Sequence, residues 1–220
     1  MTFGTPEDGP QFNPSAQFRV NDDGPRDIAL TFVGDAYVAG YGDPKALGWV
    51  SRVLARTPHG EADLTAYNLG IRGESSADVL NRWRAECDPR WKHHNERRLV
   101  LGMGAGDVHS GMTTARSRLN LANVLDDAAA TGIATFVVGP PPVLDAEVNA
   151  KLEVLVEAQA DVCARRDVTF VDCYAPLLAH DQWKSDLAAG DGVHPGQAGY
   201  GLIAWLVLHA GWQQWLHLDA

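Results

Sequence analysis

The chain alternates short apolar runs with longer segments in which apolar residues recur every three or four positions. Because strands of a parallel sheet are buried on both faces, they are apolar throughout instead of alternating with polar residues. Five runs have this character and end near a glycine, an aspartate or another turn residue. They are residues 27–34, 64–69, 99–103, 134–139 and 168–172. We therefore expect five strands of a mostly parallel sheet.

The segments between these runs have the period of amphipathic helices. Helices are predicted over about 44–56, 75–83, 113–129, 145–166 and 196–216. Ser75 or Ser76 can cap the second helix, and three prolines at 140–142 exclude helix until about Asp145. Right-handed crossovers place such helices on both faces of the sheet, so the pattern predicts an α/β fold.

Length and composition favour one domain. A chain of 220 residues with 45% hydrophobic residues can bury a sizeable core without disulfides or metal. Residues 1–26 contain several Pro, Gly and Asp and are interpreted as an N-terminal arm before a domain over 27–220. No apolar run reaches the roughly 18 residues of a membrane span, and the N-terminus lacks a secretory signal. We expect a cytoplasmic protein that has no contact with membranes.

Charge and cysteine spacing exclude further classes. A net charge of −10 disfavours nucleic acid as a partner, because phosphate binding needs clustered cations. Cys87, Cys163 and Cys173 lie far apart and are interpreted as buried free thiols. The pair His93-His94 lies in a charged segment and is interpreted as a solvated connector. We predict no metal and no cofactor.

The loops that follow the predicted strands contain the candidate chemistry, since the carboxyl ends of parallel strands meet at one edge of a sheet. Four blocks stand out: Gly34-Asp35-Ala36, residues 70–73, Gly104-Ala105-Gly106-Asp107 and Asp191-Gly192-Val193-His194. Their order and spacing resemble the SGNH hydrolases, also called the GDSL esterase and lipase family, over about residues 27–208. The resemblance implies a three-layer α/β/α sandwich of flavodoxin-like type.

The resemblance also implies roles for single residues. In that family the first block ends in the nucleophilic serine, and the last block supplies a base and its orienting carboxylate, here His194 and Asp191. Gly73 matches a glycine that offers a backbone N–H to the oxyanion. The chain departs from the family twice. Ala36 replaces the serine, and Gly106 stands where an asparagine supplies a second oxyanion donor.

These departures bear on the reaction. Ala36 has no lone pair with which to attack a carbonyl, and one lost oxyanion donor costs about 3 to 4 kcal/mol of transition-state stabilisation in comparable sites. An engineered serine-to-alanine change would account for Ala36 but not for Gly106, so the two together favour natural drift or recruitment over a single laboratory change.

The leading hypothesis is acid/base chemistry on a small molecule that brings its own nucleophile, for example an amine. The reaction would be an intramolecular substitution, an elimination or a ring closure. Its catalytic groups would be His194, Asp191 and Asp35, and further residues would contact the substrate or an oxyanion, namely Ala36, Tyr37, Gly73, Gly106 and Asp107. His109 is interpreted as a surface or structural residue, although its position two residues past Asp107 would allow it to line the mouth of the pocket.

Other interpretations stay open. Asp35 could only bond backbone amides of its turn, and Asp107 could only cap a helix. The chain could be an esterase inactivated by a change at position 36, or a non-catalytic protein that binds a ligand or another protein. Trp205 and Trp212 are expected in the core of the closing helix, although residues 212–218 could form a partner surface. A protein partner or a homo-oligomer is left open.

Overall fold

The structure is a computed structural model that describes residues 25–58 and 60–218. The predicted N-terminal arm lies outside these ranges except for its last two residues. Of these, Arg26 donates to both carboxylate oxygens of Glu96, at 2.6 and 2.9 Å, and to the backbone carbonyls of Leu216 and His217. Arg26 therefore links the entrance of the first strand to the C-terminal helix.

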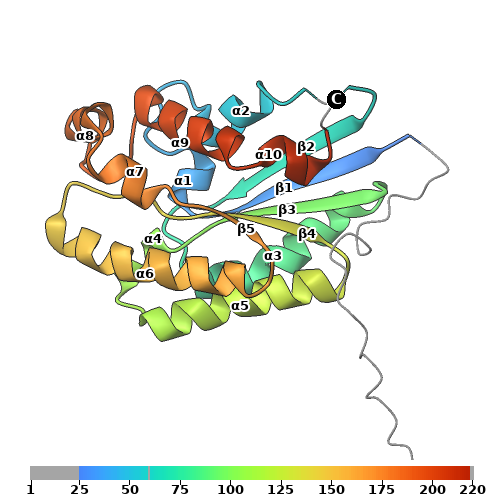
Figure 1. The fold of residues 1–220 in the computed structure, drawn as a ribbon, viewed down its shortest axis with the longest axis horizontal. Helices are drawn as coiled ribbons and strands as arrows, with labels where there is room; N and C mark the ends of the chain where they lie inside the picture. Colours follow the sequence, from blue (N-terminus) through green and yellow to red (C-terminus); the bar gives the residue numbers. More distant parts are fainter. Residues whose placement is uncertain (1–24, 59, 219–220) are drawn as a thin grey trace, which may run out of the picture.

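Five parallel strands form a single sheet, in the order β2-β1-β3-β4-β5 (Figure 1). Their bounds are β1 Asp27–Gly34, β2 Asp63–Gly70, β3 Glu96–Gly102, β4 Ala134–Val138 and β5 Thr169–Val171. This is the flavodoxin-like order, in which the strands are added first on one side of β1 and then on the other, and ligands bind at the switch point between β1 and β3. The predicted α/β fold is confirmed.

Helices cover both faces of the sheet (Figure 1). One face carries α1 Ala36–Ala39, α2 Gly48–Leu54, α9 Gln197–His209 and α10 Trp212–Leu216. The other carries α3 Ser76–Trp91, α5 Thr114–Ala130 and α6 Ala146–Ala164. Three short helices lie in the connections after β3 and β5: α4 Ala105–Ser110, α7 Tyr174–Leu178 and α8 Asp181–Ala188.

The core has two halves because side chains along a strand alternate between the faces of the sheet. Leu30 and Phe32 of β1 pack into a cluster with the buried indole of Trp212. Ala29 and Val33 of the same strand pack into the cluster on the other side. Both faces of β1 are thus fully covered, which explains its continuous apolar sequence.

The five predicted strands are all present, but the helix prediction was incomplete. The described residues form ten helices, and those missed are α1, α4, α7 and α8, which are four to eight residues long. Two turns or fewer do not establish a hydrophobic period. The closing helix predicted over 196–216 is instead two helices, because Gly211 between them adopts φ +82°.

The structure contradicts the core position predicted for Trp205, since its side chain is 57% exposed. Trp212 is fully buried and packs on Phe136 with ring centroids 5.3 Å apart, so it belongs to the core. His94 is not a solvated connector, because its Nδ1 lies 2.6 Å from Asp27 Oδ1. All three cysteines are free and buried, as predicted.

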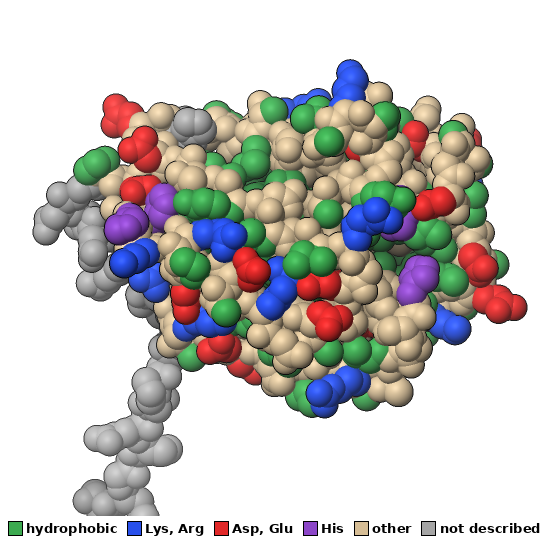
Figure 2. Space-filling model, turned by 180° about the vertical axis from the view of Figure 1, so that it is seen from behind, with side chains coloured by type: hydrophobic (Ala, Val, Ile, Leu, Met, Phe, Trp, Pro, Cys, Tyr) green, Lys and Arg blue, Asp and Glu red, His purple; other side chains and the backbone are tan. Residues whose placement is uncertain are grey.

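Charged side chains of both signs are interspersed over the face opposite that of Figure 1, as Figure 2 shows. That face therefore has no large area of a single charge. Across the described ranges, no helix combines the length and apolarity that crossing a membrane requires.

Three glycines in register close the ends of the central strands. Gly34 of β1 pairs with Gly70 of β2 and with Gly102 of β3. A Cβ on Gly34 would lie 1.9 Å from the carbonyl oxygen of Gly102, and one on Gly70 would lie 2.2 Å from the backbone nitrogen of Ala39. The absence of side chains at this row lets the turn after β1 lie directly across the strand ends.

We expect Gly34→Ala to lower the free energy of unfolding by about 3 kcal/mol, because the added methyl overlaps a backbone oxygen that cannot rotate away. Urea unfolding at constant pH measures this loss. The matched control is Gly201→Ala on α9, where an added Cβ meets no atom within 4 Å and helix propensity predicts a gain of up to about 1 kcal/mol. Equal effects of the two substitutions would contradict the packing argument.

Candidate active site

The turn after β1 places Asp35 at the switch point of the sheet. Its backbone N–H donates to the carbonyl of Gly102 on β3 at 3.1 Å. Its carboxylate Oδ1 accepts the backbone N–H of Tyr37 at 3.0 Å and so caps α1. Ala36 and Tyr37 consequently occupy the first turn of a short helix that begins at the carboxyl end of β1.

The loop before α9 positions His194. The carboxylate Oδ1 of Asp191 accepts the backbone N–H groups of Val193 and His194 at 2.9 and 2.7 Å, and Oδ2 lies 2.8 Å from His194 Nδ1. When Nδ1 carries the proton and donates it to the carboxylate, Nε2 keeps its lone pair and can act as a base.

The pKa of Asp191 reflects this arrangement. Partial burial opposes ionisation, but hydrogen bonds from the His194 side chain and from the backbone N–H groups of His194 and Val193 outweigh it and lower the pKa to about 2. The carboxylate is therefore charged at neutral pH and stabilises a proton on His194 during a reaction.

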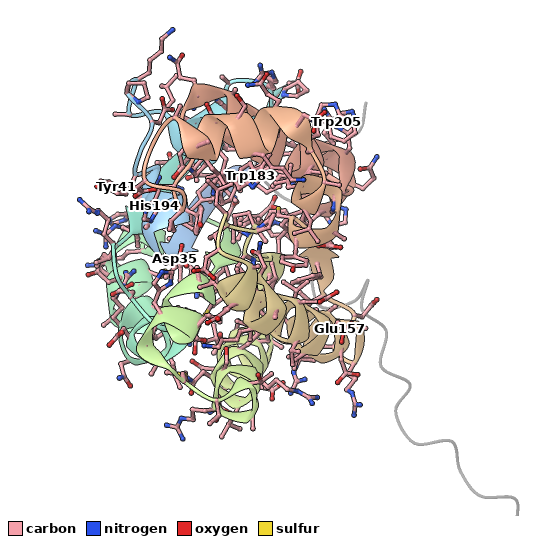
Figure 3. All side chains as sticks on the ribbon, turned by 90° about the vertical axis from the view of Figure 1, so that its left-hand side faces the viewer. Asp35, Tyr41, Glu157, Trp183, His194 and Trp205 are labelled. Carbon is pink, nitrogen blue, oxygen red and sulfur yellow. The ribbon has the colours of Figure 1, made fainter. Side chains whose placement is uncertain are left out.

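Aromatic side chains fix the His194 loop against the first turn. The hydroxyl of Tyr37 donates to the carbonyl of Val193 at 2.8 Å. The imidazole of His194 has its centroid 4.7 Å from the ring of Tyr41 and 5.5 Å from that of Tyr37. Figure 3 shows Tyr41, His194 and Asp35 along the same edge of the molecule.

A cavity of about 580 Å³ opens at this edge. It is lined by the first turn of α1, the loop after β2, helix α4 and the loop that carries His194. The lining residues are Asp35, Ala36, Tyr37, Arg72, Gly73, Glu74, Ala105, Gly106, His109, Ser110, Val193 and His194. Of the residues proposed from the sequence, the cavity brings together Asp35, Ala36, Tyr37, Gly73, Gly106 and His194, and Asp191 contacts it through His194.

Asp35 is almost completely buried and has an unusual acidity. Burial raises its pKa to about 7, against the hydrogen bond from the backbone of Tyr37 that lowers it, and the nearby negative charge of Asp107 raises it further. Glu74 adds a smaller effect in the same direction. A carboxyl group with this pKa can both give and accept a proton near neutral pH.

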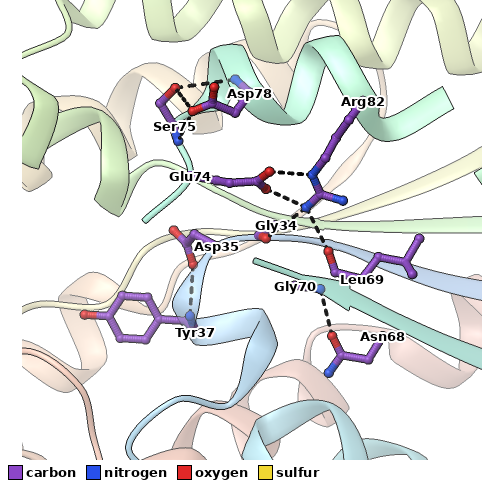
Figure 4. Close-up of polar contacts among 10 residues, drawn as sticks. All are labelled: Gly34, Asp35, Tyr37, Asn68, Leu69, Gly70, Glu74, Ser75, Asp78 and Arg82. Atoms are coloured by element: carbon purple, nitrogen blue, oxygen red, sulfur yellow. Dashed lines mark hydrogen bonds and ion pairs between the residues drawn. The ribbon is translucent and has the colours of Figure 1, made fainter. Parts of the chain in front are cut away.

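The charge of Glu74 is balanced by an arginine behind the site. Arg82 donates through Nε to Glu74 Oε1 at 2.6 Å, makes a second bond through Nη2 to Glu74 Oε2, and bonds the carbonyl of Leu69 at 2.8 Å (Figure 4). This bidentate pair fixes the loop that carries Gly73 beside Asp35.

The pKa of Asp35 predicts a change of stability with pH. Its folded pKa of about 7 exceeds the usual 3.8, so its contribution is complete below about pH 4 and is lost as the pH rises through 7. The folded and unfolded pKa values of Asp35 differ by about 3, and each pKa unit corresponds to about 1.36 kcal/mol. The stability lost as the pH rises is therefore at most about 4 kcal/mol.

Asp35→Asn keeps a side-chain oxygen that can accept the backbone N–H of Tyr37. The amide does not titrate, so the variant should not lose this stability as the pH rises. We expect the unfolding free energy of the variant, relative to that of the wild type, to increase between pH 4 and pH 8, as measured by urea unfolding at both pH values. The control is Asp127→Asn, at an exposed position on α5. Its unfolding free energy relative to that of the wild type should be the same at pH 4 and pH 8. A constant difference for Asp35→Asn would show that the folded pKa is not raised.

Asp107 lies outside the cavity. Its Oδ1 accepts the backbone N–H of Ser76 at 2.6 Å, and its Oδ2 accepts the hydroxyl of Ser117. The carboxylate thus joins α4 to the beginnings of α3 and α5. Its oxygens are bonded to protein donors, and we do not include it among the groups that contact a substrate.

Gly106 lies where the packing leaves no room for a side chain. A Cβ at this position would lie 1.9 Å from the carbonyl oxygen of Glu74, so no side chain fits unless the loop after β2 moves. Within the described part of the chain, the backbone N–H groups of Ala36, Gly73 and Gly106 donate to no other residue. These donors are available to a negatively charged oxygen in the cavity.

Sequence reasoning missed Arg72 and Glu74 as cavity residues, and it missed Tyr41, whose ring contacts the imidazole of His194. The only signal was their position in strand-end loops, next to residues of the recognised blocks. His109 was expected at the pocket mouth and does line the cavity, with Nδ1 3.0 Å from the carbonyl of Ala105. Among the residues that the structure describes, no group of three or more His, Cys, Asp or Glu side chains is arranged to hold a metal ion.

Comparison with known proteins identifies the family. A family model described as "GDSL-like Lipase/Acylhydrolase family" matches residues 32–202. The match covers most of the chain and includes all four blocks, so the chain belongs to the GDSL-like lipase/acylhydrolase family.

Individual relatives are distant. Esterase TesA of Pseudomonas aeruginosa is 29% identical over 110 residues, a match that covers 50% of this chain and 53% of the relative. In sequence, the chain thus spans about half the length of this curated relative.

Solved structures share the fold over more of the chain. A TesA crystal structure has a TM-score of 0.68 at 23% identity and covers 83% of this chain and 97% of that one. A lipase/acylhydrolase from Enterococcus faecalis has a TM-score of 0.66 at 24% identity, with 86% and 96% covered. A catalytic mutant of an acetylxylan esterase from Geobacillus stearothermophilus has a TM-score of 0.68 at 19% identity, with 83% and 93% covered. Likeness at these identities shows the fold alone.

Proposed function

We propose that this protein catalyses an intramolecular substitution on a small molecule, in which an amine of the substrate is the nucleophile. The observation that supports the proposal is a base without a protein nucleophile. His194 is oriented by Asp191 and faces the cavity, whereas the position at the first turn that carries a serine in the family holds the methyl group of Ala36.

In the proposed reaction, the lone pair of the substrate amine attacks a carbonyl carbon of the same molecule. His194 Nε2 accepts a proton from the amine nitrogen as the C–N bond forms. The bond from the carbonyl carbon to the leaving alkoxide then breaks, and His194 returns the proton to that oxygen. The products are a ring containing an amide and a free alcohol, and no acyl-enzyme forms.

Two further features support this reaction. The free backbone N–H groups of Ala36 and Gly73 can donate to the oxygen that becomes negative during the attack. Asp35, with a pKa of about 7, can take a proton from an ammonium group and so supply the neutral amine. The cavity, at about 580 Å³, is of a size that suits a small molecule.

Membership of a lipase and acylhydrolase family favours a second candidate function, an esterase whose serine has been replaced by alanine. A third possibility, a protein that only binds a ligand or a partner, would not depend on the proton-accepting nitrogen of His194. Substitution of His194 and of Ala36 separates these candidates from the proposed reaction.

The γ-ethyl ester of glutamate is a suitable probe, because its amine can close on the ester carbon to give a five-membered lactam and ethanol. We expect the protein to accelerate lactam formation above the rate in buffer. The matched control is the N-acetylated ester, which has the same ester bond but no nucleophilic amine. Equal release of ethanol from both esters would contradict the proposal, because it would show hydrolysis.

A further inference from the structure

Arg72 supplies a cationic group at the mouth of the cavity. It is the one Arg or Lys among the lining residues of the described chain. Its guanidinium carbon lies 3.3 Å from the ring centroid of Tyr41, and that ring lies 4.7 Å from the imidazole of His194. The backbone carbonyl of Tyr41 accepts the hydroxyl of Tyr200 at 2.6 Å. Arg72 therefore rests on an anchored aromatic ring beside the base.

The donors of Arg72 are not used by the protein. Among the described residues, no carboxylate lies within ion-pair distance of its guanidinium, and its N–H groups form no hydrogen bond. Stacking on Tyr41 occupies the flat face of the guanidinium but leaves the N–H groups at its edge free. Arg82, by contrast, is engaged by both oxygens of Glu74.

We propose that Arg72 binds a carboxylate group of the substrate through a bidentate pair of hydrogen bonds. This inference rests on the proposed function and narrows its substrate class to amino-acid derivatives, in which the carboxylate lies at Arg72 and the amine lies deeper, near Asp35 and His194. The charges favour a carboxylate over a phosphate. The cavity contains a single arginine together with Asp35 and Glu74, so a dianion would meet more repulsion than a monoanion.

Binding of simple ligands tests this inference without turnover. The probes are butyrate and butyramide, which have nearly the same shape and differ in charge. Each is titrated into isotope-labelled protein while the imidazole NMR signals of His194 and His109 are followed. We expect butyrate to bind at least about tenfold more tightly than butyramide, because a charge-assisted hydrogen bond contributes about 1.5 kcal/mol or more.

Three variants assign the preference to Arg72. Arg72→Gln should make the two affinities equal, and Arg72→Lys should keep part of the preference, since it retains the charge but not the bidentate geometry. The matched control is Arg97→Gln, which removes the same charge from an exposed position near the start of β3 and should change neither affinity.

Three results would overturn the inference. The first is equal binding of butyrate and butyramide to the wild type, and the second is a preference for butyrate that survives Arg72→Gln. The third is tighter binding of propylphosphonate than of butyrate, which would assign the site to a phosphate. None of these results affects the lactam assay. Lactam formation without carboxylate binding would contradict only the role of Arg72, and carboxylate binding without lactam formation would contradict only the proposed reaction.

Discussion

His194→Ala is expected to lower kcat/KM for lactam formation about 100- to 10,000-fold, the range that a positioned general base contributes. The variant lacks the nitrogen that accepts the amine proton. Its fold should be intact, because His194 lies in a surface loop whose backbone bonds to Asp191 do not need the imidazole. The rate of lactam formation from the γ-ethyl ester of glutamate measures the effect.

His209→Ala is the matched control, because His209 lies on α9 and stacks on the exposed Trp205 with ring centroids 4.1 Å apart. Asp191→Asn keeps a similar shape but removes the charge that stabilises protonated His194, so we expect it to lower the rate as well. A rate that His194→Ala leaves unchanged would contradict the proposed reaction and favour a binding protein.

Ala36→Ser is expected to place a hydroxyl at the first turn of α1 without producing an efficient esterase. Position 36 already carries a Cβ at the cavity wall, so a hydroxyl can be added without a change of backbone. Gly106 has no side chain that could donate to an oxyanion, and a missing donor of this kind lowers kcat about 100- to 1,000-fold. Hydrolysis of a short-chain aryl ester should therefore be weak at best in the single variant.

Gly106→Asn, added to Ala36→Ser, should not repair the deficit. The new Cβ would overlap the carbonyl oxygen of Glu74, and we expect a loss of about 3 kcal/mol of unfolding free energy, measured by urea unfolding. Strong, saturable ester hydrolysis by Ala36→Ser alone would instead support an esterase inactivated at position 36.

The sequence contained enough information for the sheet and for the four blocks of the site. The central strands β1, β3 and β4 were predicted because buried parallel strands are continuous apolar runs, and β1 was placed with the bounds that it has in the structure. The edge strand β2 has no fully buried residue, and it was predicted from a short run closed by Gly70. The four blocks could be proposed as a site because a resemblance in order and spacing does not depend on knowing the contacts, and residues of all four line one cavity.

The environment of the site could not be predicted in the same way. The raised pKa of Asp35 depends on complete burial and on the charge of Asp107, which lies far away in sequence. The lack of space at Gly106 depends on the carbonyl of Glu74 in another loop. The contacts of the Tyr41 ring with the guanidinium of Arg72 and, edge to face, with the imidazole of His194 join three loops. Such properties arise from contacts between segments, which local patterns do not record.

The source of the attacking atom tests the central claim most directly. The wild-type protein is incubated with the γ-ethyl ester of glutamate in ¹⁸O-labelled water, and the products are analysed by mass spectrometry. The account predicts that the enzyme-dependent product is the lactam and that it contains no ¹⁸O, because the substrate amine attacks. Enzyme-dependent formation of glutamate labelled with ¹⁸O in its γ-carboxylate would contradict the account, because water would then be the nucleophile.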